Sequence, residues 1–296
     1  MKKWLVSLLA LAAIGGASLT SANLGTSAFA ASKSKLTGKV LAVGSTALQP
    51  LAEQLGERFS SANSSVQITV QGGGSGAGLT QVQAGSVQIG DSDIFASQED
   101  GIDPSKIVDH KVAVIGIALV VNKDVGVKSL TKSQLKKIFT GKVTNWDQVG
   151  GKDQKIDLIN RASGSGTRTV FENAILGNAT AASSQEQDSN GTVQKIVSTT
   201  PGAISYLAFS YIKGQSGLKA LKINGVSPTN KNVENNKWKV WGYEHMYTKG
   251  KATGATKAFI NYFYKSSNKS LIKKLGYIPL PSMKVVKNDN GVVKDK

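Results

Sequence analysis

Beyond the first thirty-five residues, short apolar strands alternate with amphipathic helices. The segment from Leu36 to Asp93 has the pattern of strand, helix, strand, helix and strand. One of its helices places Leu51, Leu55 and Phe59 on a single face. Parallel strands need a crossover connection of a dozen or more residues, usually a helix. The alternation therefore predicts an α/β fold with a mainly parallel sheet.

Two longer apolar segments differ from these short strands. Val112–Asn122 is an almost continuous apolar run, which is typical of a strand buried on both faces. Trp238–Thr248 is a second long strand, rich in aromatic residues. A chain of 296 residues is long enough for one large domain or two medium ones.

The first thirty residues have the pattern of a secretory signal peptide. Two lysines precede an apolar run from Trp4 to Ile14, and Ala28 and Ala30 form the A-x-A pattern of a cleavage site. We expect cleavage after Ala30, a flexible leader at residues 31–35, and a secreted, extracytoplasmic protein associated with the cell envelope. An uncleaved membrane anchor is the alternative, but the apolar run is shorter than the ~20 residues of a membrane span.

Cysteine usage and charge narrow the function classes. The sequence has no cysteine, which excludes disulfides, thiolate metal sites and a lipid anchor on cysteine. The net charge is +17, and beyond residue 200 the chain has 17 lysines and four acidic residues. Such a surface suits nucleic acid, an anionic cell envelope or plain solvation. No nucleic-acid motif accompanies the charge, so we expect a lysine-rich surface that serves partly for plain solvation and partly for attraction to anionic cell-wall polymers, and we do not expect nucleic acid as a partner.

Three loops combine hydroxyl side chains with glycines where a predicted strand meets a predicted helix. They are Val43–Pro50 (VGSTALQP), Gln71–Gly78 (QGGGSGAG) and Arg161–Arg168 (RASGSGTR). The first turn of a helix has N–H groups without partners and the positive end of the helix dipole, and small residues let an anion approach. In parallel sheets, ligands bind beyond the carboxyl ends of the strands. The three loops together predict a shared oxyanion site.

Familiar phosphate and nucleophile motifs are absent from these loops. No Lys-Ser/Thr pair follows the glycines, which excludes a P-loop, and neither Ser75 nor Ser165 lies in G-x-S-x-G. His110 and His245 have no neighbouring ligand set, so we expect no metal and no cofactor. A secreted phosphatase or esterase that uses Ser75 or Ser165 as nucleophile is the main alternative from another class, but it lacks an evident base.

The ordered motifs VGSTALQPLAEQL, QGGGSGAG, IGDSD, IFTGKVTNWDQVGG and RASGSGTR resemble the phosphate-binding subunit of the high-affinity phosphate ABC transporter. The resemblance covers Lys35 to Met283. It implies a periplasmic-binding-protein-like (type II) clamshell of two α/β lobes joined by crossing strands. Lobe 1 then comprises residues 36–114 and 246–296, and lobe 2 comprises residues 115–245. The implied partners are inorganic phosphate and the permease of an ABC transporter. The protein is then a monomer and not an enzyme, and the same fold binding sulfate or molybdate is a closer alternative.

The resemblance also assigns a phosphate site to both lobes. Its residues are Thr46, the backbone of Ala47, Ser75 and Asp93 from lobe 1, and Arg161, Ser165, Gly166 and Thr167 from lobe 2. Hydroxyls and first-turn N–H groups donate hydrogen bonds, and Arg161 offers a charge-assisted fork. An ionised Asp93 only accepts, so it suits a phosphate that carries a proton and opposes sulfate. The alternative for Asp93 is a cap of the following turn.

Two positions near this site depart from the family or have another expected role. Ser163 stands where many relatives have an aspartate that supports the arginine, so we expect Arg161 to be held by another acid or less rigidly. Trp146 is expected to pack in the core and not to touch the ligand.

Overall fold

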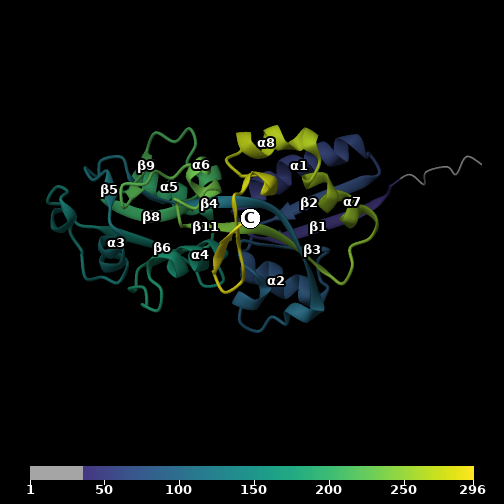
Figure 1. Ribbon diagram of the computed structural model, residues 1–296, viewed down its shortest axis with the longest axis horizontal. Helices are drawn as coiled ribbons and strands as arrows, with labels where there is room; N and C mark the ends of the chain where they lie inside the picture. Colours follow the sequence, from purple (N-terminus) through teal and green to yellow (C-terminus); the bar gives the residue numbers. More distant parts are fainter. Residues whose placement is uncertain (1–35) are drawn as a thin grey trace, which may run out of the picture. The chain divides into compact units, whose positions relative to one another are not determined.

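One mixed β-sheet runs through residues 36–296, the part of the chain that the structure, a computed structural model, describes (Figure 1). The predicted signal peptide and leader lie outside the described residues. The strand order is β2-β1-β3-β11-β4-β8-β6-β7, with β9 on the end of β4. The strands are β1 (Gly38–Gly44), β2 (Val66–Gln71), β3 (Ile89–Ser92), β4 (Ile107–Asn122), β6 (Asp157–Arg161), β7 (Gln185–Gln187), β8 (Ala203–Ala208), β9 (Leu218–Ala220) and β11 (Trp241–Lys249).

Residues 36–296 form eight α-helices. They are α1 (Gln49–Ala62), α2 (Ser75–Ala84), α3 (Lys132–Phe139), α4 (Gly166–Ile175), α5 (Asn190–Thr199), α6 (Asn230–Glu234), α7 (Gly254–Phe263) and α8 (Lys269–Lys274). In Figure 1, α1 and α7 lie on one side of β1 and β2 and α2 lies on the other, while α5 and α4 lie on opposite sides of β8 and β6. Helices on both faces bury the sheet, as the continuous apolar strands require.

Short elements complete the described chain. Six 3₁₀ helices are η1 (Ala96–Gln98), η2 (Pro104–Lys106), η3 (Trp146–Val149), η4 (Phe209–Tyr211), η5 (Ser266–Asn268) and η6 (Leu280–Ser282). Two small two-stranded sheets pair β5 (Ser129–Leu130) with β10 (Lys222–Ile223) and β12 (Val285–Lys287) with β13 (Val293–Asp295).

Two long strands, β4 and β11, connect the two halves of the sheet. β4 pairs with β11 as far as Gly116, and from Ile117 onward it pairs with β8. Both contacts are antiparallel, whereas β1, β2 and β3 pair in parallel on one side and β6, β7 and β8 pair in parallel on the other. The prediction of a mainly parallel sheet therefore holds within each half and is wrong at the centre, because each connecting strand runs against its neighbours.

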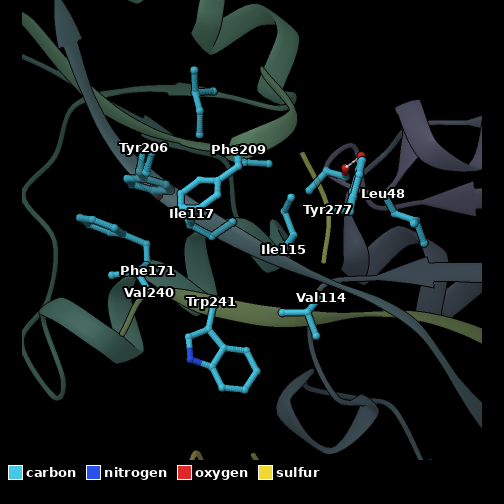
Figure 2. Close-up of a cluster of buried hydrophobic side chains, with 14 of the residues drawn as sticks. Leu48, Val114, Ile115, Ile117, Phe171, Tyr206, Phe209, Val240, Trp241 and Tyr277 are labelled. Atoms are coloured by element: carbon cyan, nitrogen blue, oxygen red, sulfur yellow. Dashed lines mark hydrogen bonds between the residues drawn. The ribbon is translucent and has the colours of Figure 1, made fainter. Parts of the chain in front are cut away.

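The buried core lies along these connecting strands (Figure 2). Every residue of β4 from Val112 to Asn122 is buried. Phe171 stacks on Tyr206 with ring centroids 4.0 Å apart. Gly116 has no side chain because the ring of Phe209 occupies that space: a Cβ there would lie 2.4 Å from the ring. The core therefore packs α4 against β8 and η4 against β4.

Several predicted boundaries shift by a few residues. β4 begins at Ile107 rather than Val112. The five residues before Val112 include polar side chains, but their backbone still pairs with β11. β11 begins at Trp241, and Trp238 instead packs in the core with its Nε1 donating to the carbonyl of Ile117 at 3.0 Å. Trp146 is buried, as expected, and donates to the carbonyl of Gly202 at 2.9 Å.

Candidate functional site

The first loop follows β1 and leads into α1. Ser45 Oγ accepts hydrogen bonds from the backbone N–H groups of Ala47 at 3.0 Å and Leu48 at 3.1 Å, so Ser45 caps this turn. The Ala47 N–H, a predicted anion donor, is engaged by Ser45 in this structure. Thr46 is left free of the capping role, and its hydroxyl points toward the other half of the sheet, where it accepts from the Asn190 N–H at 3.2 Å.

The second loop brings the N-terminus of α2 against the third loop. Ser75 is the first residue of α2 and is fully buried, and its Oγ accepts from the Asp93 N–H at 3.0 Å. The Gly76 N–H donates to the carbonyl of Gly164 at 3.0 Å. A backbone hydrogen bond thus joins two loops that are nearly ninety residues apart in the sequence.

Gly166 permits the closest approach in the site. A Cβ at this position would lie 2.2 Å from Ser75 Oγ and 3.0 Å from the Cβ of Asp93. Gly166 and Thr167 are the first two residues of α4, so their N–H groups have no acceptor within the helix. The Ser165 hydroxyl caps α4 by accepting from the Arg168 N–H at 3.3 Å. These three residues therefore present the positive end of α4 to Ser75 and Asp93.

Arg161, at the end of β6, is a buried cation held by backbone carbonyls. It is 1% exposed; its Nε donates to the carbonyl of Gln187 at 3.1 Å and its Nη2 to that of Asp188 at 2.9 Å. The expected alternative acid support is absent from these contacts, because two carbonyls replace it. Nη2 also lies 3.4 Å from Thr46 Oγ1, while Nη1 finds no partner among residues 36–296.

The electrostatics of Arg161 follow from this setting. Burial lowers the pKa of Arg161 below its ordinary value, and the nearby charges of Asp93 and Asp188 counteract part of that effect. A guanidinium remains charged in proteins even so. Its unpartnered Nη1 is a buried donor, and a buried donor without an acceptor is costly. The arrangement therefore favours an anion beside Nη1.

Asp93 is the buried acid of the site. It is 3% exposed, and each of its carboxylate oxygens accepts a hydroxyl: Ser45 donates to Oδ1, and Thr167 donates to Oδ2 at 2.7 Å. The two hydroxyls come from the first and third loops, on the two sides of the connecting strands. Neither hydroxyl belongs to the turn that follows Asp93, so these contacts do not cap that turn.

The structure brings the predicted site residues together. Hydrogen bonds link Thr46 with Arg161, Ser75 with Asp93 and Asp93 with Thr167, and Gly166 packs against Ser75. Ala47 lies beside Thr46 in the same turn. Ser165 lies next to Gly166, but its hydroxyl is used as the α4 cap.

Sequence reasoning missed Asn190, the first residue of α5. It is fully buried, and its Nδ2 lies 3.1 Å from Thr46 Oγ1 and 3.4 Å from Thr167 Oγ1. Its Oδ1 accepts from the Ala208 N–H at 3.0 Å, which fixes the amide with its donors toward the site. Tyr211 was also missed, and its hydroxyl donates to the carbonyl of Thr46 at 2.8 Å. Neither residue lies in a glycine-rich loop, so the sequence offered no signal.

The two histidines have their side-chain hydrogen-bond partners outside the three loops. Residues 36–296 contain no cluster of three or more His, Asp or Glu side chains that would hold a metal ion. His245 Nδ1 lies 2.7 Å from Asp109 Oδ1, and His110 Nε2 lies 3.1 Å from Thr248 Oγ1. Neither histidine bonds to Ser75 or Ser165. Over the same residues, no helix is both long enough and apolar enough to span a membrane.

The fold and this two-sided anion site define a class of protein. A model of the PBP superfamily domain matches residues 30–267, and the chain belongs to that superfamily. Its fold is accordingly a two-lobed α/β clamshell with crossing strands, as predicted. The chain is 49% identical over 258 residues to the phosphate-binding protein PstS of Bacillus subtilis, covering 87% of this chain and 86% of that one.

More distant relatives agree. The phosphate-binding protein PstS of Staphylococcus aureus strain USA300 is 28% identical over 304 residues, which cover 95% of this chain and 89% of the relative. A Clostridium perfringens structure, named as a phosphate ABC transporter substrate-binding protein with bound phosphate, has a TM-score of 0.77 and 31% identity, covering 82% of this chain and all of that one. An ABC-type phosphate transport receptor from Vibrio cholerae has a TM-score of 0.66 and 27% identity, covering 81% and 99%.

Proposed function

We propose that this protein captures inorganic phosphate between its two lobes and delivers it to the permease of an ABC transporter. The observation that carries the proposal is the pairing of a buried arginine with an unpartnered Nη1 and a buried acid, Asp93, in one site. The names of the relatives, phosphate-binding proteins and a phosphate-bound structure, support phosphate as the anion.

The proposed phosphate ligands come from both lobes. They are Thr46, the Ala47 backbone, Ser75, Asp93, Arg161, Ser165, Gly166 and Thr167. Arg161 supplies the charge, the α4 N-terminus supplies N–H donors, and the hydroxyls donate. For Ala47 and Ser165 the role requires their present capping bonds to be shared or rearranged when phosphate enters.

Asp93 gives the site its selectivity in this account. An ionised carboxylate only accepts, so it pairs with the proton of a phosphate and meets sulfate with a lone pair and a like charge. An unpaired buried acceptor costs about 1–3 kcal/mol, more when it is charged, and each ~1.4 kcal/mol is tenfold in affinity. Discrimination above a thousandfold is therefore within reach.

We propose lobe boundaries at residues 114/115 and 245/246. They are supported by the change of partner along β4, which leaves β11 at Gly116 and joins β8 at Ile117. A phosphate that contacts both lobes favours the closed population, so closure is a hinge motion about β4 and β11.

We propose that the protein is a binding protein without enzymatic activity and acts as a monomer. Ser75 and Ser165 both accept hydrogen bonds from backbone N–H groups, at 3.0 Å and 3.3 Å, and neither contacts a base that would activate it. The signal-peptide pattern supports an extracytoplasmic location, and the basic last third suits retention at anionic wall polymers.

Equilibrium dialysis with labelled phosphate tests this proposal. We expect saturable binding of one phosphate per chain, competed by unlabelled phosphate and not by equal sulfate or molybdate. A chromogenic phosphate ester should not be turned over. Absence of phosphate binding, or steady turnover of the ester, would contradict the proposed function.

A further inference from the structure

An acidic residue, Glu244, lies in the middle of the buried strand β11. All residues of β11 from Trp241 to Thr248 are buried, and Glu244 is 0% exposed. Burying an isolated carboxylate is far more costly than burying a neutral acid that donates a hydrogen bond. Neither Glu244 oxygen has a hydrogen-bond donor among residues 36–296. As an ionised group, Glu244 would thus be a buried charge without compensation.

The backbone at Glu244 is irregular. Glu244 pairs with Ala113 of β4 but His245 pairs with Lys111, so Val112 is an extra residue in β4 at this point. Such β-bulges re-aim neighbouring side chains and recur beside functional sites. On its other side β11 pairs antiparallel with β3, with Met246 opposite Asp91 and His245 opposite Ser92, so the next residue of β11, Glu244, falls beside Asp93.

The strand neighbours of Glu244 are acidic on one side and uncharged on the other: Asp93 and Asp91 come from the β3 segment, and β4 contributes Ala113. Tyr211 of η4 and Tyr277, in the segment before η6, are titratable groups whose pKa a charge on Glu244 would raise. Asp91 is also fully buried, and neither of its oxygens has a partner among the described residues. Burial raises the pKa of Glu244 well above its usual value, and the charges of Asp93 and Asp91 raise it further.

The two neighbouring carboxyl groups differ in the donors that they have. Asp93 already accepts hydrogen bonds from the hydroxyls of Ser45 and Thr167, one on each oxygen. Glu244 accepts from no donor, so only a proton of its own gives it a hydrogen-bond partner.

We propose that Glu244 is a neutral carboxylic acid that donates its proton in a hydrogen bond to Asp93 and so acts as a positioning residue for the phosphate site. This inference rests on the proposed function. This hydrogen bond fixes the orientation of the Asp93 carboxylate and leaves it a hydrogen-bond acceptor. Neutral Glu244 also keeps the pocket from gaining a second negative charge that would oppose an anion. Loss of the Glu244 proton would add a negative charge beside Asp93 and so weaken phosphate binding.

Calorimetric titration with phosphate between about pH 6 and about pH 9 tests the role in solution. Glu244→Gln keeps a donor toward Asp93 but cannot ionise, and Glu244→Leu has no donor. We expect Glu244→Gln to bind within about threefold of wild type near neutrality and to gain relative to wild type as pH rises. Glu244→Leu should bind at least tenfold more weakly, or about 1.4 kcal/mol, across the range. Glu57→Gln, at an exposed position of α1, is the matched control and should follow wild type.

The ratio of variant to wild-type affinity cancels the ionisation of phosphate itself. A loss of affinity in Glu244→Gln equal to that in Glu244→Leu overturns the assignment. Infrared spectroscopy of the ligand-free protein adds a readout that needs no phosphate: a carboxylic-acid carbonyl band present in wild type at neutral pH and reduced in Glu244→Gln. Identical bands in the two proteins contradict a neutral Glu244. A wild type that binds no phosphate overturns the proposed function together with this role, whereas a wild type that binds phosphate but has the same infrared bands as Glu244→Gln overturns only the role.

Discussion

The two sides of the site hold their buried charges differently. Asp93, beside the first and second loops, has both oxygens engaged by hydroxyl donors. Arg161, at the third loop, is fixed by two backbone carbonyls, but its Nη1 has no partner within the described residues 36–296. The protein therefore satisfies the Asp93 carboxylate with its own hydrogen bonds, whereas Arg161 keeps one N–H donor for a ligand. This difference suits an anion that is attracted by Arg161 and donates a hydrogen bond to Asp93.

The largest effect is expected on the arginine side. Arg161→Ala should weaken phosphate binding at least a hundredfold, because charge-assisted hydrogen bonds contribute roughly 1.5–3 kcal/mol each and tenfold in affinity is about 1.4 kcal/mol. Calorimetry measures the change. Arg58→Ala, at an exposed position of α1, removes the same charge and should leave affinity nearly unchanged. An equal loss in both variants would mean that Arg161 acts only through net charge.

The contact between the two sides is tested at Gly166. Gly166→Ala should weaken binding about tenfold or more, since its Cβ would stand 2.2 Å from Ser75 Oγ and force the loops apart. Gly126→Ala is the matched control, because a Cβ at Gly126 meets nothing within 4 Å. Phosphate titration of both variants decides the point, and wild-type affinity in Gly166→Ala would show that the loops need not meet this closely.

The acid side is tested by selectivity rather than by affinity alone. Asp93→Asn replaces an acceptor by an amide that can also donate. We expect phosphate affinity to fall by about tenfold and sulfate affinity to rise, so that the ratio of the two falls at least tenfold. Competition dialysis measures that ratio. If the ratio is unchanged, Asp93 does not distinguish the anions.

The Glu244→Gln substitution is expected to have the smallest effect on phosphate binding but a clear effect on thermal stability. Its pKa is raised in the folded protein by burial and by Asp93, so its contribution to stability is complete below the unfolded pKa of about 4.3 and is lost as pH rises toward the folded pKa. Glu244→Gln removes this dependence. Its Tm should therefore exceed that of wild type by an amount that grows with pH, as measured by calorimetric melting across acid, neutral and alkaline buffers. A constant Tm difference would argue that Glu244 is ionised in the folded state.

Much of the fold was predictable from local patterns. Strand–helix alternation predicted β1 to β3 with α1 and α2, and the continuous apolar run predicted β4, because periodicity and burial act locally. The antiparallel centre of the sheet was not predictable, since the direction in which β4 and β11 meet depends on pairing between segments more than a hundred residues apart. The first five residues of β4 were missed for the same reason, as their polar side chains hide a paired backbone.

The candidate site was predictable only where chemistry and loop position coincided. Hydroxyls, glycines and Arg161 lie in strand-to-helix loops, and the structure brings those loops together. Asn190 and Tyr211 reach Thr46 from segments whose sequences have no distinctive motif. Glu244 did carry a signal, an acid within an aromatic buried strand, but only the structure identifies Asp93 as its neighbour.

Isothermal calorimetry of the wild-type protein with phosphate and with sulfate tests the central claim most directly. The account predicts a saturable heat of phosphate binding at one site per chain and a sulfate affinity lower by a thousandfold or more. Equal affinities for the two anions, or no heat with phosphate, would contradict a site in which Arg161 attracts the anion and Asp93 requires its proton.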